Sequence, residues 1–166
     1  HEIRTPMNAV VGMSGMLMET SIDATQQEMV RVIQDSADHL LAVIDDILDL
    51  SRVEAGTLHL ESQPFDLAEV IRSSVALLRP RATHKRLALE SNLALGGASH
   101  LVGDPKRIRQ ILNNLIGNAI KFTDQGRVRV TATTVYEAPD RALVRLCVED
   151  TGIGIAPAVQ QRLFQP

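Results

Sequence analysis

Residues Asp104–Phe122, DPKRIRQILNNLIGNAIKF, predict a helix with a defined start and one apolar face. Asp104 is a favourable helix cap, and Pro105 stands at the first helical position, where its missing N–H costs little. Apolar residues then recur at three- and four-residue spacing, which is typical of a helix packed on a core. We expect this helix to end near Phe122, with Gly126 closing it. The side chains that we expect to be buried are Ile108, Ile111, Leu112, Leu115 and Ile116.

Short apolar runs on both sides of this helix predict strands. These runs are residues 57–61, 87–90, 127–135 and 142–148, and a turn around 139–140 joins the last two. A further helix opens at Asp66, and we expect Pro80 to bend or end it. This mixture of strands and helices predicts an α+β domain over residues 57–166.

Residues 1–55 predict two helices joined by a short polar connection. Thr25 and Glu28 match a capping box, and we expect the second helix to run to about Glu54 and stop at Gly56. Its apolar seam has steps of three and four, as in coiled coils and helical bundles. A second copy of the hairpin would cover this surface in a dimeric four-helix bundle, whereas the alternative is a long helix packed on its own domain. The seam consists of Val30, Ile33, Ala37, Leu40, Ile44, Ile47 and Ser51.

The composition of the 166 residues excludes several classes of function. The net charge is −3 and only 2% of the residues are aromatic, so we expect no nucleic-acid partner and no base-stacking surface. Cys147 is the single cysteine, which excludes an internal disulfide and favours a reducing, cytoplasmic location. No apolar stretch approaches the ~20 residues of a membrane span, so we expect no membrane segment in this stretch.

Three polar side chains follow one face of the helix quoted above. Asn114, Asn118 and Lys121 are four and three residues apart, so they project in one direction. Carboxamide oxygens are hard ligands that suit Mg²⁺, and an ammonium beside them neutralises phosphate charge. The alternative is that these residues form only the wet side of an amphipathic helix.

A glycine-rich turn follows the last predicted strand. In the stretch Asp150–Ile155, DTGIGI, a carboxylate that we expect to be buried stands at the strand end. Gly152 and Gly154 let the chain turn sharply and approach a ligand closely. Without context, this pattern is as often an ordinary tight turn.

The N-terminal stretch His1–Pro6, HEIRTP, holds a possible nucleophile. A neutral imidazole is a good nucleophile near neutral pH, and Glu2 can accept its other ring N–H and carry the proton. Thr5 is three residues beyond Glu2 and could position a water molecule. A lone His–Glu pair is more often a solvated helix surface.

The three stretches resemble the boxes of sensor histidine kinases, and they follow one another in the chain in the same order: HEIRTP resembles the H box, the helix with Asn114, Asn118 and Lys121 the N box, and DTGIGI the G1 box. Residues 162–166 resemble the start of the F box. The resemblance spans essentially the whole chain. It implies a dimerisation and phosphotransfer hairpin at 1–55 and a Bergerat-type ATP-binding α/β sandwich at 57–166. The sandwich would be incomplete, because the ATP lid and the second glycine-rich box are not in the sequence. We therefore expect this stretch by itself to bind ATP weakly.

The resemblance also implies roles for individual residues, with ATP and Mg²⁺ as the ligands. His1 is implied as the phospho-acceptor, Glu2 as its general base and Thr5 as the residue for dephosphorylating a response regulator. Asn118 is implied as the Mg²⁺ ligand, with Asn114 and Lys121 toward the phosphates. The remaining nucleotide-binding residues are Asp150, which accepts from the adenine amino group, and Gly152 and Gly154.

The function implied is autophosphorylation on histidine and relay to an aspartate of a receiver domain, in cis or in trans, by a homodimer. The stretch Ile44–Gly56 is similar to hybrid kinases that carry a receiver domain downstream. Two alternatives stay open: an ATPase of the same nucleotide-binding superfamily, and a non-catalytic dimerisation or phosphorelay module.

Overall fold

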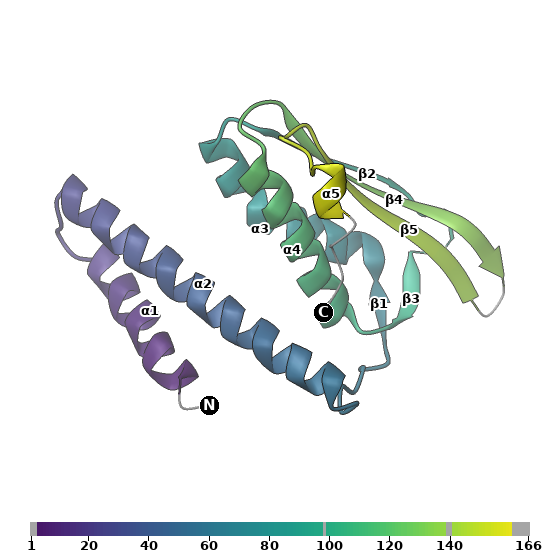
Figure 1. Ribbon diagram of the computed structural model, residues 1–166, viewed down its shortest axis with the longest axis horizontal. Coiled ribbons are helices and arrows are strands. Elements are labelled where there is room, and N and C mark those ends of the chain that lie inside the picture. The colour runs from purple at the N-terminus through teal and green to yellow at the C-terminus, as the bar shows by residue number, and fades with distance from the viewer. Residues whose placement is uncertain (1–2, 98, 139–140, 161–166) are drawn as a thin grey trace. The chain divides into compact units, whose positions relative to one another are not determined.

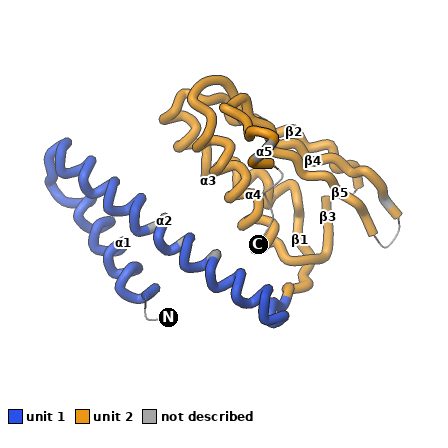
Figure 2. Tube along the Cα trace, viewed as in Figure 1, with its two compact units in different colours: residues 1–59 blue, residues 60–166 orange. Residues whose placement is uncertain are grey.

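The computed structural model describes residues 3–97, 99–138 and 141–160. These residues form two compact units, residues 1–59 and residues 60–166 (Figure 2). Each unit has its own packing and is described by itself. No helix among the described residues is both long enough and apolar enough to cross a membrane.

The first unit is a helical hairpin of α1 (Arg4–Met18) and α2 (Ala24–Glu54), as Figure 1 shows. The capping box forms two residues earlier than we expected: the Asp23 carboxylate accepts from the Gln26 amide at 2.8 Å, and the Gln26 side chain accepts from the Asp23 amide at 3.0 Å. The prediction of Thr25 and Glu28 is wrong because Thr25 already lies inside the helix, whereas Asp23 has the extended backbone of a cap.

The C-terminal end of α2 is as predicted. Gly56 has a φ of +65°, and its N–H donates to the carbonyl of Val53 at 3.0 Å. The next amide, of Thr57, donates to Arg52 at 2.9 Å. This pair of bonds is the Schellman motif, which needs a left-handed residue and therefore favours glycine.

The hairpin buries only part of its apolar seam. Val30 and Ala37 are 6% and 3% exposed, and Ser14 of α1 is buried with them. Other positions of the same seam face solvent: Ile33, Leu40 and Ile47 are 47%, 45% and 58% exposed. One hairpin thus buries only Val30 and Ala37 of this seam, and an apolar strip that includes Ile33, Leu40 and Ile47 stays open.

The second unit places two helices on a small mixed sheet (Figure 1). Strand β4 is central: it pairs in parallel with β2 and antiparallel with β5, while β1 and β3 form a separate antiparallel ribbon. In Figure 1, α3 and α4 lie side by side over one face of the sheet. The elements are β1 (Gln63–Asp66), α3 (Leu67–His84), β2 (Ala88–Ala94), β3 (His100–Gly103), α4 (Pro105–Phe122), β4 (Arg127–Ala138), β5 (Arg141–Asp150) and the short α5 (Pro157–Gln160).

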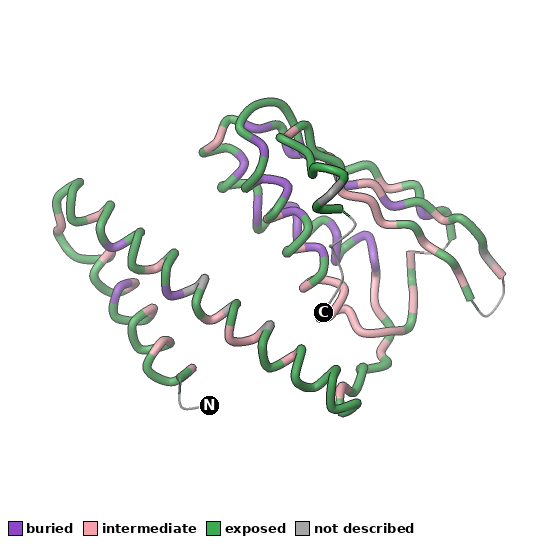
Figure 3. The backbone as a smooth tube through the Cα atoms, in the orientation of Figure 1, coloured by how far each residue is buried: buried purple, intermediate pink, exposed green. Residues whose placement is uncertain are grey.

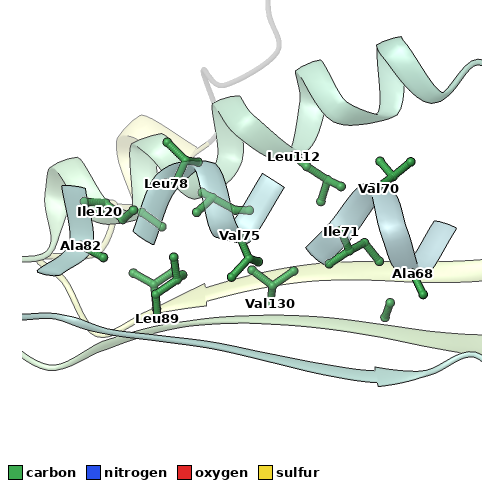
Figure 4. Close-up of a cluster of buried hydrophobic side chains, with 14 of the residues drawn as sticks. Ala68, Val70, Ile71, Val75, Leu78, Ala82, Leu89, Leu112, Ile120 and Val130 are labelled. Carbon is green, nitrogen blue, oxygen red and sulfur yellow. The ribbon is translucent and has the colours of Figure 1, made fainter. Parts of the chain in front are cut away.

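The core lies between these helices and the sheet. Side chains of α3 and α4 meet those of β2 and β4 in Figure 4. Ile71, Ile116 and Val130 are fully shielded from solvent. Within the second unit, the purple segments of Figure 3 mark this layer. The α+β class expected for this domain is therefore confirmed.

On α4, two of the five predicted core residues are exposed. Leu112 and Ile116 are buried and Ile108 packs against the core, but Ile111 and Leu115 are 56% and 48% exposed. The reason is that α4 contacts α3 and the sheet with one side only, so the apolar stripe of the sequence is wider than the surface it meets.

Three local predictions need correction. Residues 57–61 form no strand. The strand is β1, a few residues later, which pairs with β3. Pro80 does not end α3, which continues to His84, since one proline removes a single helical hydrogen bond. Gly126 does not close α4, whose cap is Thr123. Gly126 instead has a φ of +110° in the turn before β4, where a Cβ would lie 2.2 Å from Thr151 Oγ1.

Candidate functional site

The start of α4 is fixed by its capping aspartate. One carboxylate oxygen of Asp104 accepts from the amides of Lys106 and Arg107, both at 3.1 Å, and the other accepts from the amide of Glu61 at 3.1 Å. The hydrogen bond from Arg107, followed by those from Glu61 and Lys106, lowers the pKa of Asp104. The Lys106 ammonium donates to the Glu61 carboxylate at 2.9 Å, and this hydrogen bond raises the pKa of Lys106.

The predicted phosphate and metal side chains lie on the open face of α4. Asn114, Asn118 and Lys121 are all exposed, whereas Leu112 and Ile116 of the same helix are buried in the core. Within the described residues, neither asparagine amide makes a hydrogen bond to the protein. Both carboxamides are therefore available to an external ligand.

The charge at the end of α4 comes from Lys121. Its Nζ lies 5.3 Å from the centre of the Phe122 ring, and Phe122 is itself 49% exposed. Among the described residues this is the interaction that orients the ammonium, which leaves its N–H donors free for an anion.

The turn after β5 is fastened to this same end of α4. The Ile153 amide donates to the carbonyl of Phe122 at 3.3 Å. A Cβ on Gly152 would lie 2.3 Å from that carbonyl oxygen and 2.9 Å from Asp150 Oδ1. Only glycine permits this approach, and Gly154, at φ +66°, has the left-handed backbone that also favours glycine. The two glycines predicted as functional thus bring the turn against the helix.

Asp150 differs from the expectation in its burial. We expected a buried carboxylate, but the side chain is exposed. Asp150 is the last residue of an edge strand, and the chain turns away directly after it, so no element of the described chain covers the carboxylate. Its Oδ1 accepts from the Gly152 amide at 2.9 Å, which holds the carboxylate at the turn.

The N-terminal candidates belong to the other unit. His1, Glu2 and the stretch 162–166 lie outside the described residues. Thr5 is exposed in the first turn of α1. Beside it, Arg4 donates to Asp45 of α2 through Nε at 3.0 Å and Nη2 at 2.5 Å, so the start of α1 is clamped to α2.

One residue of this region had no signal in the sequence. Lys85, at the end of α3, donates through Nζ to the carbonyls of Ile120, Lys121 and Thr123 at 3.1, 2.8 and 3.2 Å. In the sequence, Lys85 is one cation in a polar stretch before β2. Only the packing of α3 beside α4 reveals its partners.

Two family comparisons divide the chain in the same order as the motifs. Residues 1–56 match the His Kinase A (phospho-acceptor) domain. Residues 103–166 match the histidine kinase-, DNA gyrase B- and HSP90-like ATPase family. The second match includes α4 and the turn after β5.

Curated relatives match over nearly the full chain. The chain is 40% identical over 165 residues to the signal transduction histidine-protein kinase BarA of Escherichia coli strain K12. It is 41% identical to the sensor histidine kinase GacS of Pseudomonas protegens, and 41% identical to the sensory/regulatory protein RpfC of Xanthomonas campestris. Each match covers 99% of this chain, but the chain spans only 18% of BarA and GacS and 23% of RpfC.

Solved structures agree in fold. Full-length ShkA in complex with AMPPNP is 37% identical, with a TM-score of 0.70, covering 99% of this chain and 35% of ShkA. The histidine kinase AdeS of Acinetobacter baumannii is 27% identical, with a TM-score of 0.66, covering all of this chain and 79% of AdeS. The hairpin followed by an ATPase-type α/β domain, and the resemblance read from the three motifs, are therefore confirmed: the chain belongs to the sensor histidine kinases.

Proposed function

We propose that this chain is the core of a two-component kinase that transfers the γ-phosphoryl group of ATP to His1 and then to an aspartate of a receiver domain. One observation carries the nucleotide half of this proposal. The glycine turn of Asp150 is held against the end of α4, the helix that presents Asn118 and Lys121. The motifs thus converge on one place, in a family whose relatives are named histidine kinases.

In this proposal, Asp150 accepts a hydrogen bond from the adenine amino group, since its carboxylate is exposed and fixed at the turn by the Gly152 amide. Gly152 and Gly154 let the backbone approach the nucleotide. Asn114 and Lys121 face the phosphates, because both are exposed and Lys121 carries the positive charge. The relative ShkA holds AMPPNP, a nucleotide of this class.

The donor atoms on α4 fit Mg²⁺. No group of three or more His, Cys, Asp or Glu side chains that could hold a metal occurs in the described part of the chain, so a metal cage built of protein alone is not the arrangement found there. A Mg²⁺ ion that keeps several of its waters would need only one or two protein oxygens. The unpartnered carboxamide of Asn118 supplies such an oxygen. When bound, the ion would neutralise charge on the phosphates.

The phosphotransfer step is assigned to His1 and Glu2 on the strength of the family pattern. An imidazole nitrogen of His1 forms the N–P bond as the bond between the γ-phosphorus and the bridging oxygen breaks, and ADP leaves with that oxygen. Glu2 accepts the proton from the other ring nitrogen, so that the phosphohistidine is neutral at the ring. We assign Thr5, which is exposed on the first turn of α1, to orienting a water molecule for dephosphorylation of the response regulator.

A homodimer and a receiver domain complete the proposal. The open strip of Ile33, Leu40 and Ile47 on α2 is the surface that a second hairpin would cover. The receiver domain, in cis or in trans, supplies the aspartate that takes the phosphoryl group from His1.

Labelling with [γ-³²P]ATP tests the proposed reaction. The full-length protein, incubated with Mg²⁺ and labelled ATP, should acquire acid-labile, alkali-stable phosphate, and the His1→Gln variant should not. A superfamily ATPase would release inorganic phosphate without labelling the protein, and a non-catalytic module would do neither. Label that persists in His1→Gln at another histidine would contradict the assignment of His1.

A further inference from the structure

The ammonium of Lys85 caps the C-terminal end of α4. Its three hydrogen bonds go to the carbonyls of Ile120, Lys121 and Thr123, which use all three of its N–H donors. The Asp124 carboxylate lies 3.8 Å away and is 89% exposed, so it adds little. Lys85 is thus committed to the backbone of another helix.

The C-terminal end of α4 has no left-handed capping residue, because its cap Thr123 is extended. The last carbonyls of any α-helix lack an intrahelical partner. At the ends of α2 and α3, a left-handed residue, Gly56 or Arg86, lets the following amides reach these carbonyls. Thr123 at the end of α4 has φ −107° and ψ 122° instead. A cation at this place also meets the negative end of the helix dipole. Lys85 therefore replaces the missing local cap.

The remaining carbonyl of this group, that of Phe122, belongs to the glycine turn. It accepts from the Ile153 amide at 3.3 Å, and Gly152 packs on it. Two groups therefore satisfy the carbonyls at this helix end. Lys85 donates to those of Lys121 and Thr123, and the turn that carries Asp150 donates to that of Phe122, which lies between them.

Lys85 is itself fixed in place by the end of α3. The Arg86 amide donates to Thr83 and the Leu87 amide to Ala82, both at 2.9 Å. Arg86 has a φ of +58°, so these bonds form a Schellman motif directly after Lys85. Ala82 and Leu87 are buried, which anchors this corner in the core. The ammonium therefore projects from a rigid support.

We propose that Lys85 is a positioning residue of the nucleotide site: it sets the end of α4 so that Asn118 and Lys121 stand at a fixed place relative to Asp150. Lys85 itself faces backbone carbonyls and does not touch the nucleotide. This inference rests on the proposed function, and it adds a residue outside all three motifs.

Three variants of the full-length protein test the inference. Lys85→Met keeps the length of the side chain but removes the cation, Lys85→Arg keeps the cation, and Lys106→Met is a matched control. Lys106 is an exposed lysine at the other end of α4 that bonds Glu61. We expect Lys85→Met to weaken Mg²⁺–ATP binding about tenfold, as loss of a supporting residue does. Lys85→Arg and Lys106→Met should stay near wild type.

Amide hydrogen exchange of the nucleotide-free protein supplies a second readout. The Ile153 amide should exchange faster in Lys85→Met but not in Lys106→Met. If Lys85→Met melts below the assay temperature, Lys85→Gln replaces it, and its ATP affinity should lie between those expected for Lys85→Met and Lys85→Arg. The inference would be overturned if Lys85→Met kept wild-type ATP affinity and an unchanged Ile153 exchange rate. It would also be overturned if Lys106→Met lost as much ATP affinity as Lys85→Met. A wild-type protein that binds no ATP would refute the proposed function, while the exchange rates would still decide the role of Lys85.

Discussion

The α-carbon of Gly152 lies so close to the carbonyl oxygen of Phe122 that a Cβ there would sit 2.3 Å from that oxygen. The contact joins the turn after β5 to the last turn of α4. It is backbone against backbone, so no side-chain rotation can relieve an added methyl group.

Gly152→Ala should therefore separate the turn from α4. The clash must move the backbone, and we expect a loss of about 1–3 kcal/mol in the free energy of unfolding. ATP affinity should fall by more than this destabilisation accounts for, because Asp150 moves with the turn. Urea unfolding and calorimetric ATP titration measure the two effects.

Gly117→Ala is the control for Gly152→Ala. Gly117 lies inside α4, and a Cβ there meets nothing within 4 Å. Alanine should stabilise this helix slightly, since glycine is about 0.5–1 kcal/mol less favourable than alanine in a helix interior. Equal loss of ATP affinity in both variants would argue against a specific role for the Gly152 contact.

Arg86→Gly should stabilise the second unit. Arg86 is the one non-glycine residue with positive φ in the described chain, at +58°. A side chain in that conformation costs about 1–2 kcal/mol, and glycine avoids this cost. The greater freedom of glycine in the unfolded state offsets part of the gain. We expect a net gain of about 1 kcal/mol in urea unfolding. Arg81→Gly, in the last turn of the same helix, should instead destabilise it.

Sequence chemistry predicted those elements whose ends are set locally. Asp66 and Asp104 cap α3 and α4 through their own side chains, and Gly56 ends α2, as the local pattern indicates. The family boxes likewise placed Asn118 and Gly152 on the elements that the structure brings together. Such features depend on a few neighbouring residues, so the sequence is enough to find them.

Other features that the sequence missed depend on tertiary packing. Ile111 and Leu115 fit an apolar stripe, but nothing in the sequence shows that α4 contacts its neighbours with a narrower side. Asp150 is exposed because it ends an edge strand, and the edge is set by the strand order. Lys85 is far from α4 in sequence, so only the packing of α3 beside α4 identifies its carbonyl partners.

Asp104 should make stability depend on acid pH. Its pKa is lowered from 3.8 by the Arg107 amide and then by the Glu61 and Lys106 amides. A carboxylate with a lowered pKa stabilises the fold fully above its unfolded pKa, and that contribution is lost as the pH falls through the folded pKa.

Asp104→Asn tests this dependence through the melting temperature. The variant should melt below wild type at pH 7. The difference should be smaller at pH 3, because pH 3 lies below the unfolded pKa of 3.8, where this contribution to stability is already being lost. Glu149→Gln, an exposed position at the end of β5, serves as the control for removing a carboxylate. A difference of equal size at both pH values would contradict the assignment.

Ile47→Glu should abolish self-association of the protein. Ile47 is 58% exposed on α2, so a single hairpin tolerates glutamate there, whereas a second hairpin would have to bury it. Each aliphatic side chain buried in the dimer contributes roughly 1.5–3 kcal/mol. Light scattering should show a dimer for wild type and a monomer for the variant. Arg31→Glu, off the seam, should remain dimeric; a monomeric wild type at micromolar concentration would refute the bundle.

Asn118→Asp should weaken Mg²⁺–ATP binding of the full-length protein while leaving its fold intact. The change keeps the shape of an exposed side chain that has no hydrogen-bond partner within the described residues, so the melting temperature should hold. The new charge would stand beside the phosphates, where repulsion outweighs any tighter hold on the ion. Calorimetry should show at least about a tenfold loss of affinity, whereas Asn92→Asp, exposed on β2, should show none. Affinity equal to wild type would remove Asn118 from the proposed site, because a carboxylate cannot be added next to a triphosphate without effect.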